Sequence, residues 1–233
     1  MKLDAPLLEG RFRRRYKRFF ADVEVDGGEV IVAHCPNTGS LAGCKVEGAP
    51  AWLRDSQDPK RKLRYSWQAI HVDGTWVNVD TNLPNRAVRE WVEKGKLPEL
   101  EGYARVRPEV KYGTGSRIDL LLEDDGKPPC YVEIKNTTLA TDGVAMFPDA
   151  VTSRGLKHLG ELIEVVEQGA RAVQFFFVSR SDVQRFRPAD AIDPDYSRRL
   201  REAAAAGVEV VAYAVQVRRD GLRPAHPLEV DLS

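Results

Sequence analysis

The stretches SRIDLLLE at residues 116–123 and CYVEIK at residues 130–135 decide how this chain of 233 residues is interpreted. In an extended strand alternate side chains lie on the same face. The first stretch therefore predicts a strand with Asp119 on one face, opposite three apolar residues that share the other face: Ile118, Leu120 and Leu122. A carboxylate in an otherwise apolar strand is costly unless a charged partner or a metal ion balances it.

Glu133 and Lys135 are separated by one residue, so we expect both side chains on the same face of the second strand. If the two strands pair as a hairpin, Asp119 and Glu133 lie side by side. Adjacent carboxylates repel each other, but a divalent cation makes the pair favourable. Because Mg²⁺ prefers carboxylate oxygens and water as ligands, the pattern predicts a site for Mg²⁺ (or Mn²⁺).

A cation at this site suggests phosphodiester chemistry, since a bound ion lowers the pKa of water and stabilises charge on a phosphoryl oxygen. Asp119, Glu133 and Lys135 are the candidate catalytic residues, and Lys135 can orient or deprotonate the attacking water or stabilise the transition state. Glu109, Asp119 and Glu133 are the candidate metal ligands, and Glu90 is a candidate fourth carboxylate. The alternative is a structural network of ion pairs on a half-exposed sheet.

Around these strands, residues 83–233 predict a mixed α/β domain with the order α-β-β-β-α-β-α-β. The first helix is expected at 86–94, with Asn85 as its N-cap and Gly95 at its end. The remaining elements are expected as strands at 103–111, 116–123, 130–135, 172–178 and 208–217, and as helices at 153–168 and 197–206.

Residues 1–82 predict a β-rich unit with about five short strands separated by turn signals. These strands are expected at residues 19–25, 30–33, 51–53, 66–72 and 75–79. Their number suits a small barrel, for which an OB-type barrel is one candidate, and a small open sheet is the other.

Several segments together resemble a known family. They are AHCPNTGS at 33–40, PKRKL at 59–63, EVKYG at 109–113, SRID at 116–119, YVEIK at 131–135, FPDAV at 147–151 and RGLKH at 154–158. The spacing of Asp119 and the EIK sequence resembles the PD-(D/E)XK nuclease superfamily, although Ile118 stands where the superfamily has a proline. The chain as a whole resembles the sugar fermentation stimulation protein A family.

This resemblance implies an N-terminal OB-like β-barrel over residues 1–82, which is expected to be a nucleic-acid-binding domain. It also implies a PD-(D/E)XK restriction-endonuclease-like α/β/α domain over residues 83–233. The family has been linked to DNA binding and to regulation of sugar (maltose) metabolism. The resemblance does not decide whether its members cut nucleic acid.

The chain has 35 basic and 35 acidic residues, which argues against coating nucleic acid by bulk charge but not against local basic patches. One patch is GRFRRRYKRFF at 10–20, where aromatics can stack on unpaired bases, with a solvated strand or loop whose aromatics lie in the core as the alternative. The polar loop 34–40 is another candidate contact. The predicted DNA-binding residues are Arg13, Arg14, Arg15, Lys17, Lys60, Arg61, Lys62, Arg154 and Lys157. For Lys157, an ion pair with Glu161 is the alternative.

No apolar run approaches the roughly 20 residues of a membrane helix, and the first 20 residues hold no signal peptide, so we expect a cytoplasmic protein. Three cysteines without a C-x-x-C pair argue against a disulfide framework and against a standard zinc site. Three hypotheses follow. The chain is a Mg²⁺-dependent deoxyribonuclease, a non-catalytic and largely sequence-independent DNA-binding protein, or an interaction module with an inactive nuclease-like core.

Overall fold

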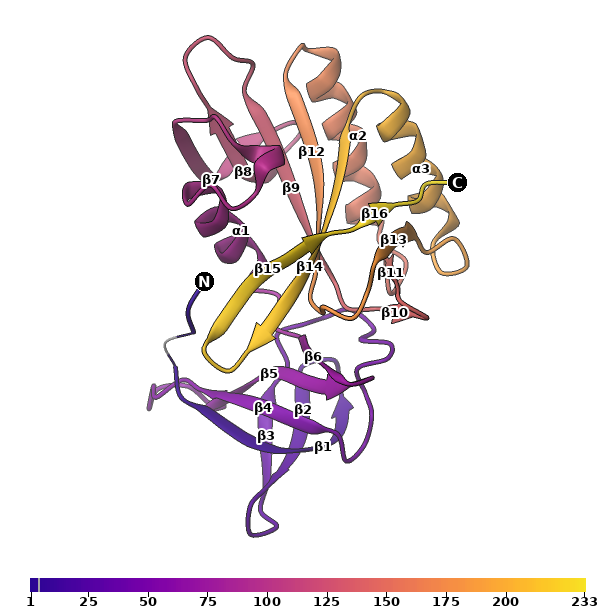
Figure 1. Ribbon diagram of the computed structural model, residues 1–233. Helices are drawn as coiled ribbons and strands as arrows, with labels where there is room; N and C mark the ends of the chain where they lie inside the picture. The colour runs from indigo at the N-terminus through magenta and orange to yellow at the C-terminus, as the bar shows by residue number, and fades with distance from the viewer. Residues whose placement is uncertain (4) are drawn as a thin grey trace.

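The computed structural model describes residues 1–3 and 5–233, which form two domains stacked end to end (Figure 1). No helix in this part of the chain is both long and apolar enough to span a membrane. The N-terminal domain contains strands β1 (Leu7–Tyr16), β2 (Phe20–Val25), β3 (Val30–His34), β4 (Pro50–Asp55), β5 (Tyr65–Val72) and β6 (Thr75–Asn78).

These strands lie in the order β3-β2-β1-β4-β5-β6, and a pairing of β3 with β5 at His34 and Ser66 closes the first five into a barrel. The closed barrel confirms the OB-type expectation over the open sheet. Its interior is apolar, and Phe12 stacks on Trp67 there with the ring centroids 4.8 Å apart.

Strand β1 is not among the strands expected from the sequence, and the physical reason lies in its arginines. Phe12 is its one fully buried side chain, and a register shift between Phe12 and Arg14 interrupts the alternation. Arg13 Nε donates to Glu24 at 2.9 Å and Arg14 Nε to Asp22 at 2.8 Å, so the neighbouring strand β2 neutralises both charges.

The C-terminal domain is built on a six-stranded mixed sheet in the order β15-β14-β12-β9-β8-β7. Its strands are β7 (Arg105–Tyr112), β8 (Ser116–Glu123), β9 (Cys130–Thr137), β12 (Arg171–Val178), β14 (Glu209–Arg218) and β15 (Gly221–Pro227). The helices are α1 (Pro84–Glu93), the 3-10 helix η1 (Pro98–Leu100), α2 (Ser153–Glu167) and α3 (Pro194–Ala205). β9, β12 and β14 run parallel to one another.

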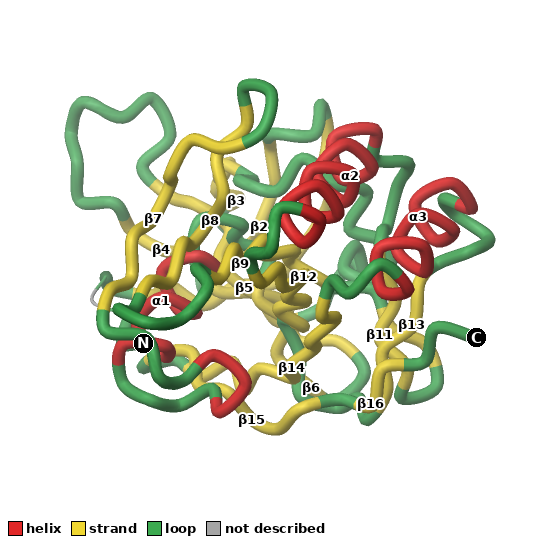
Figure 2. Tube along the Cα trace, turned by 90° about the horizontal axis from the view of Figure 1, so that it is seen from above, coloured by secondary structure: helices red, strands yellow, loops and turns green. Residues whose placement is uncertain are grey.

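Helices cover both faces of this sheet, as the α/β/α expectation requires. α2 and α3 lie side by side on one face, and α1 lies on the other (Figure 2). β12 is buried on both faces, because Phe175 and Phe177 face the α1 side while Phe176 and Val178 face the α2 side.

Some elements are not expected from the sequence. They include a second small sheet of β10 (Ala140–Thr141), β11 (Val144–Phe147), β13 (Arg185–Pro188) and β16 (Glu229–Val230). The N-cap prediction for Asn85 is wrong, because α1 starts earlier, with Leu83 at the cap and Pro84 in its first turn. Asn85 is therefore inside the helix, and its side chain is free for another role.

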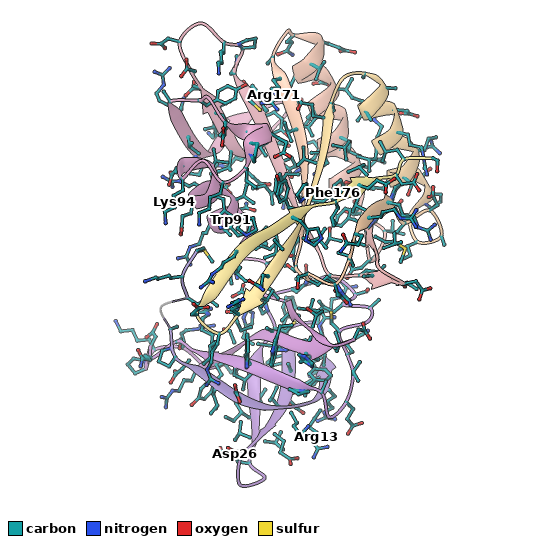
Figure 3. All side chains as sticks on the ribbon, in the orientation of Figure 1. Arg13, Asp26, Trp91, Lys94, Arg171 and Phe176 are labelled. Carbon is teal, nitrogen blue, oxygen red and sulfur yellow. The ribbon has the colours of Figure 1, made fainter. Side chains whose placement is uncertain are left out.

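The two domains share a continuous joint. Trp52 and Ala69 of the barrel belong to the same apolar core as Trp91 of α1. Arg180, only 3% exposed, pairs with Asp182 at 2.6 Å and reaches across the joint to Asp73 at 3.1 Å. Figure 3 shows Trp91 near this joint and Arg13 at the far end of the barrel.

Candidate active site

Strands β8 and β9 separate at the predicted carboxylates. Their antiparallel register joins Leu120 to Val132, and Asp119 and Glu133 occupy the next position, where the backbone pairing stops. Asp119 Oδ2 instead accepts a hydrogen bond from the Ile134 amide at 2.6 Å. The carboxylate thus satisfies a donor that strand pairing would otherwise have used, and the two strands diverge around it.

The expectation that Ile118, Leu120 and Leu122 share a face is wrong. Leu120 and Leu122 lie in the core on the α1 side, whereas Ile118 lies in the core on the α2 side. The reversal occurs at Asp119, opposite Glu109, whose backbone has a φ of +55° that non-glycine residues seldom adopt. A local kink therefore replaces simple alternation at the site.

Helices from both faces of the sheet reach the point of divergence. Asn85 of α1 donates from Nδ2 to Asp119 Oδ1 at 2.7 Å. His158 of α2 contacts the Oε1 of Glu133 through Nδ1. Lys135 Nζ donates to the same Oε1 at 2.7 Å and lies 3.5 Å from His158 Nδ1. Each carboxylate is thus fixed by its own helix.

The local sequence explains why α2 brings a histidine here. Thr152 caps the helix by accepting a hydrogen bond from the Gly155 amide at 3.1 Å. The buried face that follows contains Gly155, His158, Leu159 and Leu162 at helical spacing, so His158 is a polar residue on an inward face.

The surroundings of the two carboxyl groups shift their pKa values in opposite directions. Burial, together with the charge of Glu133, raises the pKa of Asp119 to about 7. Burial also acts to raise the pKa of Glu133, but the hydrogen bond with His158 and the charge of Lys135 outweigh it, so this pKa is lowered. Glu133 is therefore ionised at neutral pH, while Asp119 titrates there when no cation is bound.

The residues present fit a divalent cation through two carboxylates rather than three. Glu133 is 3% exposed, and its Oε2 has no hydrogen-bond partner in the described structure, so a buried acceptor is available. Asp119 lies beside it in the register. Among residues 1–3 and 5–233 no group of three histidine, cysteine or acidic side chains is arranged for a metal ion. Mg²⁺ commonly uses one or two carboxylates and keeps several waters.

The structure does not bring Glu109 and Glu90 to this point. Glu109 is exposed and does not line the cavity that contains Asp119 and Glu133. Glu90 points to the other end of α1, where it accepts a hydrogen bond from Lys94 at 2.6 Å.

A cavity of about 400 Å³ surrounds the site, and one of its walls comes from the barrel. Asn37, Thr38 and Gly39, from the polar loop at 34–40, line it together with Asp119 and Glu133. The loop is held by Asp149, whose Oδ2 accepts from the Leu41 amide at 2.8 Å. Both domains therefore shape the site.

The predicted DNA-binding residues fall into three groups. Arg154 lines the cavity, and its Nε lies 3.4 Å from His158 Nε2. Lys157 forms the ion pair with Glu161 at 3.4 Å and also donates to the Thr114 carbonyl at 2.8 Å, so it ties α2 to the turn between β7 and β8.

The second and third groups lie on the barrel. Arg13 and Arg14 are paired with carboxylates, as described above, and Arg15 supports the cavity loop by donating to the Asn37 carbonyl at 2.8 Å. The third group lies in the β1–β2 turn and the β4–β5 loop and contains Lys17, Lys60, Arg61 and Lys62. None of these four residues is in an ion pair within the described chain.

Sequence reasoning missed Asn85, His158 and Asp149 as parts of the site. For His158 a signal existed, since it occupies the apolar face of a helix whose periodicity is clear. Asn85 and Asp149 contact residues 34 and 108 positions away in the chain, and no local pattern indicates such contacts.

Comparison with known proteins gives a consistent result. A family model described as the sugar fermentation stimulation protein RE domain matches residues 82–221, and one described as the SfsA N-terminal OB domain matches residues 14–79. The chain is 53% identical over 234 residues to the sugar fermentation stimulation protein homolog of Maricaulis maris, covering 100% of both chains. It is 54% identical over 230 residues to that of Geobacter sulfurreducens, covering 99% of this chain and 98% of the relative.

A solved structure is similar over the whole length. The structure of Pyrococcus furiosus SfsA in complex with Ca²⁺ has a TM-score of 0.89 and 31% sequence identity, covering 99% of this chain and 98% of the other. Both domains are thus found together in an experimental structure.

Proposed function

The chain belongs to the sugar fermentation stimulation protein family, and we propose that it binds DNA and hydrolyses phosphodiester bonds with a divalent cation held by Asp119 and Glu133. One observation carries the proposal. Asp119 and Glu133 meet where β8 and β9 diverge, beside Lys135, and Glu133 presents a buried oxygen without a partner in the described structure. The Ca²⁺ in the Pyrococcus furiosus relative supports it, since Ca²⁺ and Mg²⁺ both prefer oxygen ligands.

When bound, Mg²⁺ or Mn²⁺ lowers the pKa of a water and stabilises charge on a phosphoryl oxygen. The remaining roles belong to the protein. Asn85 fixes Asp119, and His158 fixes Glu133, so both carboxylates are positioned before substrate arrives. Lys135, half-buried in the cavity, holds an ammonium group that can donate to the attacking water or to a phosphate oxygen.

DNA binding in this proposal is largely independent of sequence. Arg154 supplies a cation inside the cavity, and the basic residues without carboxylate partners on the described part of the barrel supply others. Contacts of this kind neutralise phosphates and carry no base information, so affinity falls steeply with salt. The proposal includes a cytoplasmic location, which agrees with three unpaired, buried cysteines.

The test uses the full chain with linear duplex, circular and single-stranded DNA in Mg²⁺ or Mn²⁺. Glu133→Gln keeps the shape of the side chain but removes its charge, and we expect cleavage to fall by more than about 100-fold. Glu164→Gln, at an exposed position of α2, is the matched control and is expected to cleave normally. Cleavage that survives Glu133→Gln would reject the assignment.

The alternative is a non-catalytic DNA-binding regulator, with a role in sugar (maltose) metabolism as the family resemblance implies. It predicts salt-dependent binding without metal-dependent cleavage, and the same experiment distinguishes it. A chain that neither binds nor cleaves DNA would instead be an interaction module with an inactive core.

A further inference from the structure

A second cleft, on the barrel, is not used by the proposed chemistry. Its volume is about 420 Å³, and it lies between the β1–β2 turn, the end of β3 and the β4–β5 loop. Its walls are formed by Phe19, Phe20, His34, Arg61, Lys62 and Leu63. Phe19 is 48% exposed, the largest apolar side chain among the exposed ones described. An exposed aromatic beside an apolar cleft is typical of a binding surface rather than of a stable core.

The aromatic wall is held in a fixed arrangement. The ring of Phe20 stacks on Tyr16 with centroids 5.4 Å apart and an angle of 17° between the planes. The guanidinium of Arg14 lies 5.0 Å from the centroid of the same Tyr16 ring. The Phe19 carbonyl accepts from the Cys35 amide at 2.7 Å, which ties the turn to the end of β3. A planar ligand can therefore stack here at little cost in side-chain ordering.

The charges around the cleft point to a polyanion. Lys17, Lys60 and Lys62 are exposed, and none of them is in an ion pair within residues 1–3 and 5–233. Two arginines just outside the cleft are in ion pairs, Arg14 with Asp22 and Arg64 with Asp55. Arg61 and Lys62, which line the cleft, are therefore both without a carboxylate partner in the described structure.

The cleft and the catalytic cavity are close along the chain. His34, in the cleft, and Asn37, in the cavity wall, are three positions apart in the chain, a span of at most about 10 Å. Beside this segment lies a groove of about 500 Å³ that contains Arg18 and Lys45 and shares Thr38 with the cavity. Arg18, in this groove, adjoins Phe19 of the cleft in the chain, so the groove lies between the aromatic cleft and the cavity that contains Asp119 and Glu133.

We propose that the cleft is a stacking site for an unpaired base. The protein thereby binds single-stranded DNA, and the DNA backbone lies along the basic groove between the cleft and the catalytic cavity. The inference rests on the proposed function and names its substrate class. A duplex covers the faces of its bases, so an aromatic cleft flanked by free cations selects for an unpaired strand. Base stacking on one aromatic side chain contributes about 1–3 kcal/mol to single-strand binding.

The test measures binding by the full chain in EDTA, so that cleavage plays no part. Fluorescence anisotropy gives the Kd of an oligothymidylate of about 20 nucleotides and of a duplex of the same length, each long enough to fill the site of a single OB domain. We expect Phe19→Ala to raise the Kd of the single strand by about 5- to 150-fold and that of the duplex by less than about 2-fold. Phe19→Trp should retain single-strand affinity. Val30→Ala, which truncates another exposed apolar residue of the barrel, is the matched control and should change neither value.

The outcomes separate this inference from the proposed function. If Phe19→Ala weakens both ligands equally, or neither, or if wild type binds neither of them, the stacking site is rejected, whatever the cleavage assay shows. If Phe19→Ala selectively weakens the single strand while no DNA is cut, the stacking site stands and the catalytic proposal fails. Thermal denaturation of each variant verifies folding, which an exposed position should not disturb.

Discussion

Replacing Asp119 by asparagine should stabilise the metal-free protein, and the size of the effect should depend on pH. Burial raises the pKa of Asp119 from 3.8 to about 7, so ionising it in the folded state costs at most about 4 kcal/mol. The sign follows from linkage. Between pH 4 and pH 7 the unfolded carboxyl is ionised while the folded one is protonated, so stability falls as pH rises and levels off above about 7.

The amide introduced by Asp119→Asn would not carry this charge. Two groups now donate hydrogen bonds to the carboxylate, Asn85 Nδ2 and the Ile134 amide. The NH₂ group of the new side chain would face one of these donors, so one hydrogen bond would be lost. We therefore expect the free energy of unfolding at pH 8 to rise by about 2 kcal/mol, which is about half of the upper limit. This gain corresponds to a rise in Tm of about 4–8 °C. At pH 4 the gain should disappear or reverse.

The assay is thermal denaturation in EDTA from pH 4 to pH 8, followed by circular dichroism. Asp125→Asn is the matched control, because Asp125 is exposed in a loop and its ion pair with Arg105 is weak. A Tm difference between Asp119→Asn and wild type that is the same at every pH would refute the linkage argument.

Three further predictions concern the cation, the joint and the core. Ca²⁺ at millimolar concentration should raise the Tm of wild type but not of Glu133→Gln, and an equal rise in both would place the cation elsewhere. Arg180→Ala should lower the free energy of unfolding in urea by about 3 kcal/mol, since it removes a buried charge that reaches Asp73 across the joint, whereas the exposed Arg105→Ala should cost less than about 1 kcal/mol. Trp91→Ala should cost about 3–5 kcal/mol in the same assay, and a loss below about 1 kcal/mol would contradict its burial in the shared core.

Elements with a clear period are predictable from the sequence. Helix α2 is expected at residues 153–168 and spans Ser153–Glu167, because its apolar face recurs at helical spacing over four turns. Strand β8 is expected and found at Ser116–Glu123. Strand β1 escapes prediction because its arginines obscure the alternation, and their carboxylate partners lie on another strand. Short strands such as β10 depend on their neighbours and leave no pattern of their own.

The candidate site is predictable in part. The proximity of Asp119 and Glu133 follows from hairpin register, which alternation and turn length determine. The kink at Asp119 does not follow from either, and neither does the position of Glu109 outside the cavity. The support that Asn85 and His158 give depends on how two helices dock on opposite faces of the sheet, which a single sequence does not encode locally.

The wall that the barrel loop adds to the cavity has a consequence for biosynthesis. During translation the barrel emerges and folds first, and it contains neither Asp119 nor Glu133. The carboxylates emerge later, and β9 is flanked by strands on both sides only once β12, which ends at Val178, has also emerged. A nascent chain therefore has no complete cavity while only the barrel has emerged, so a ligand of this cavity meets the full set of cavity residues only after both domains have contributed to it.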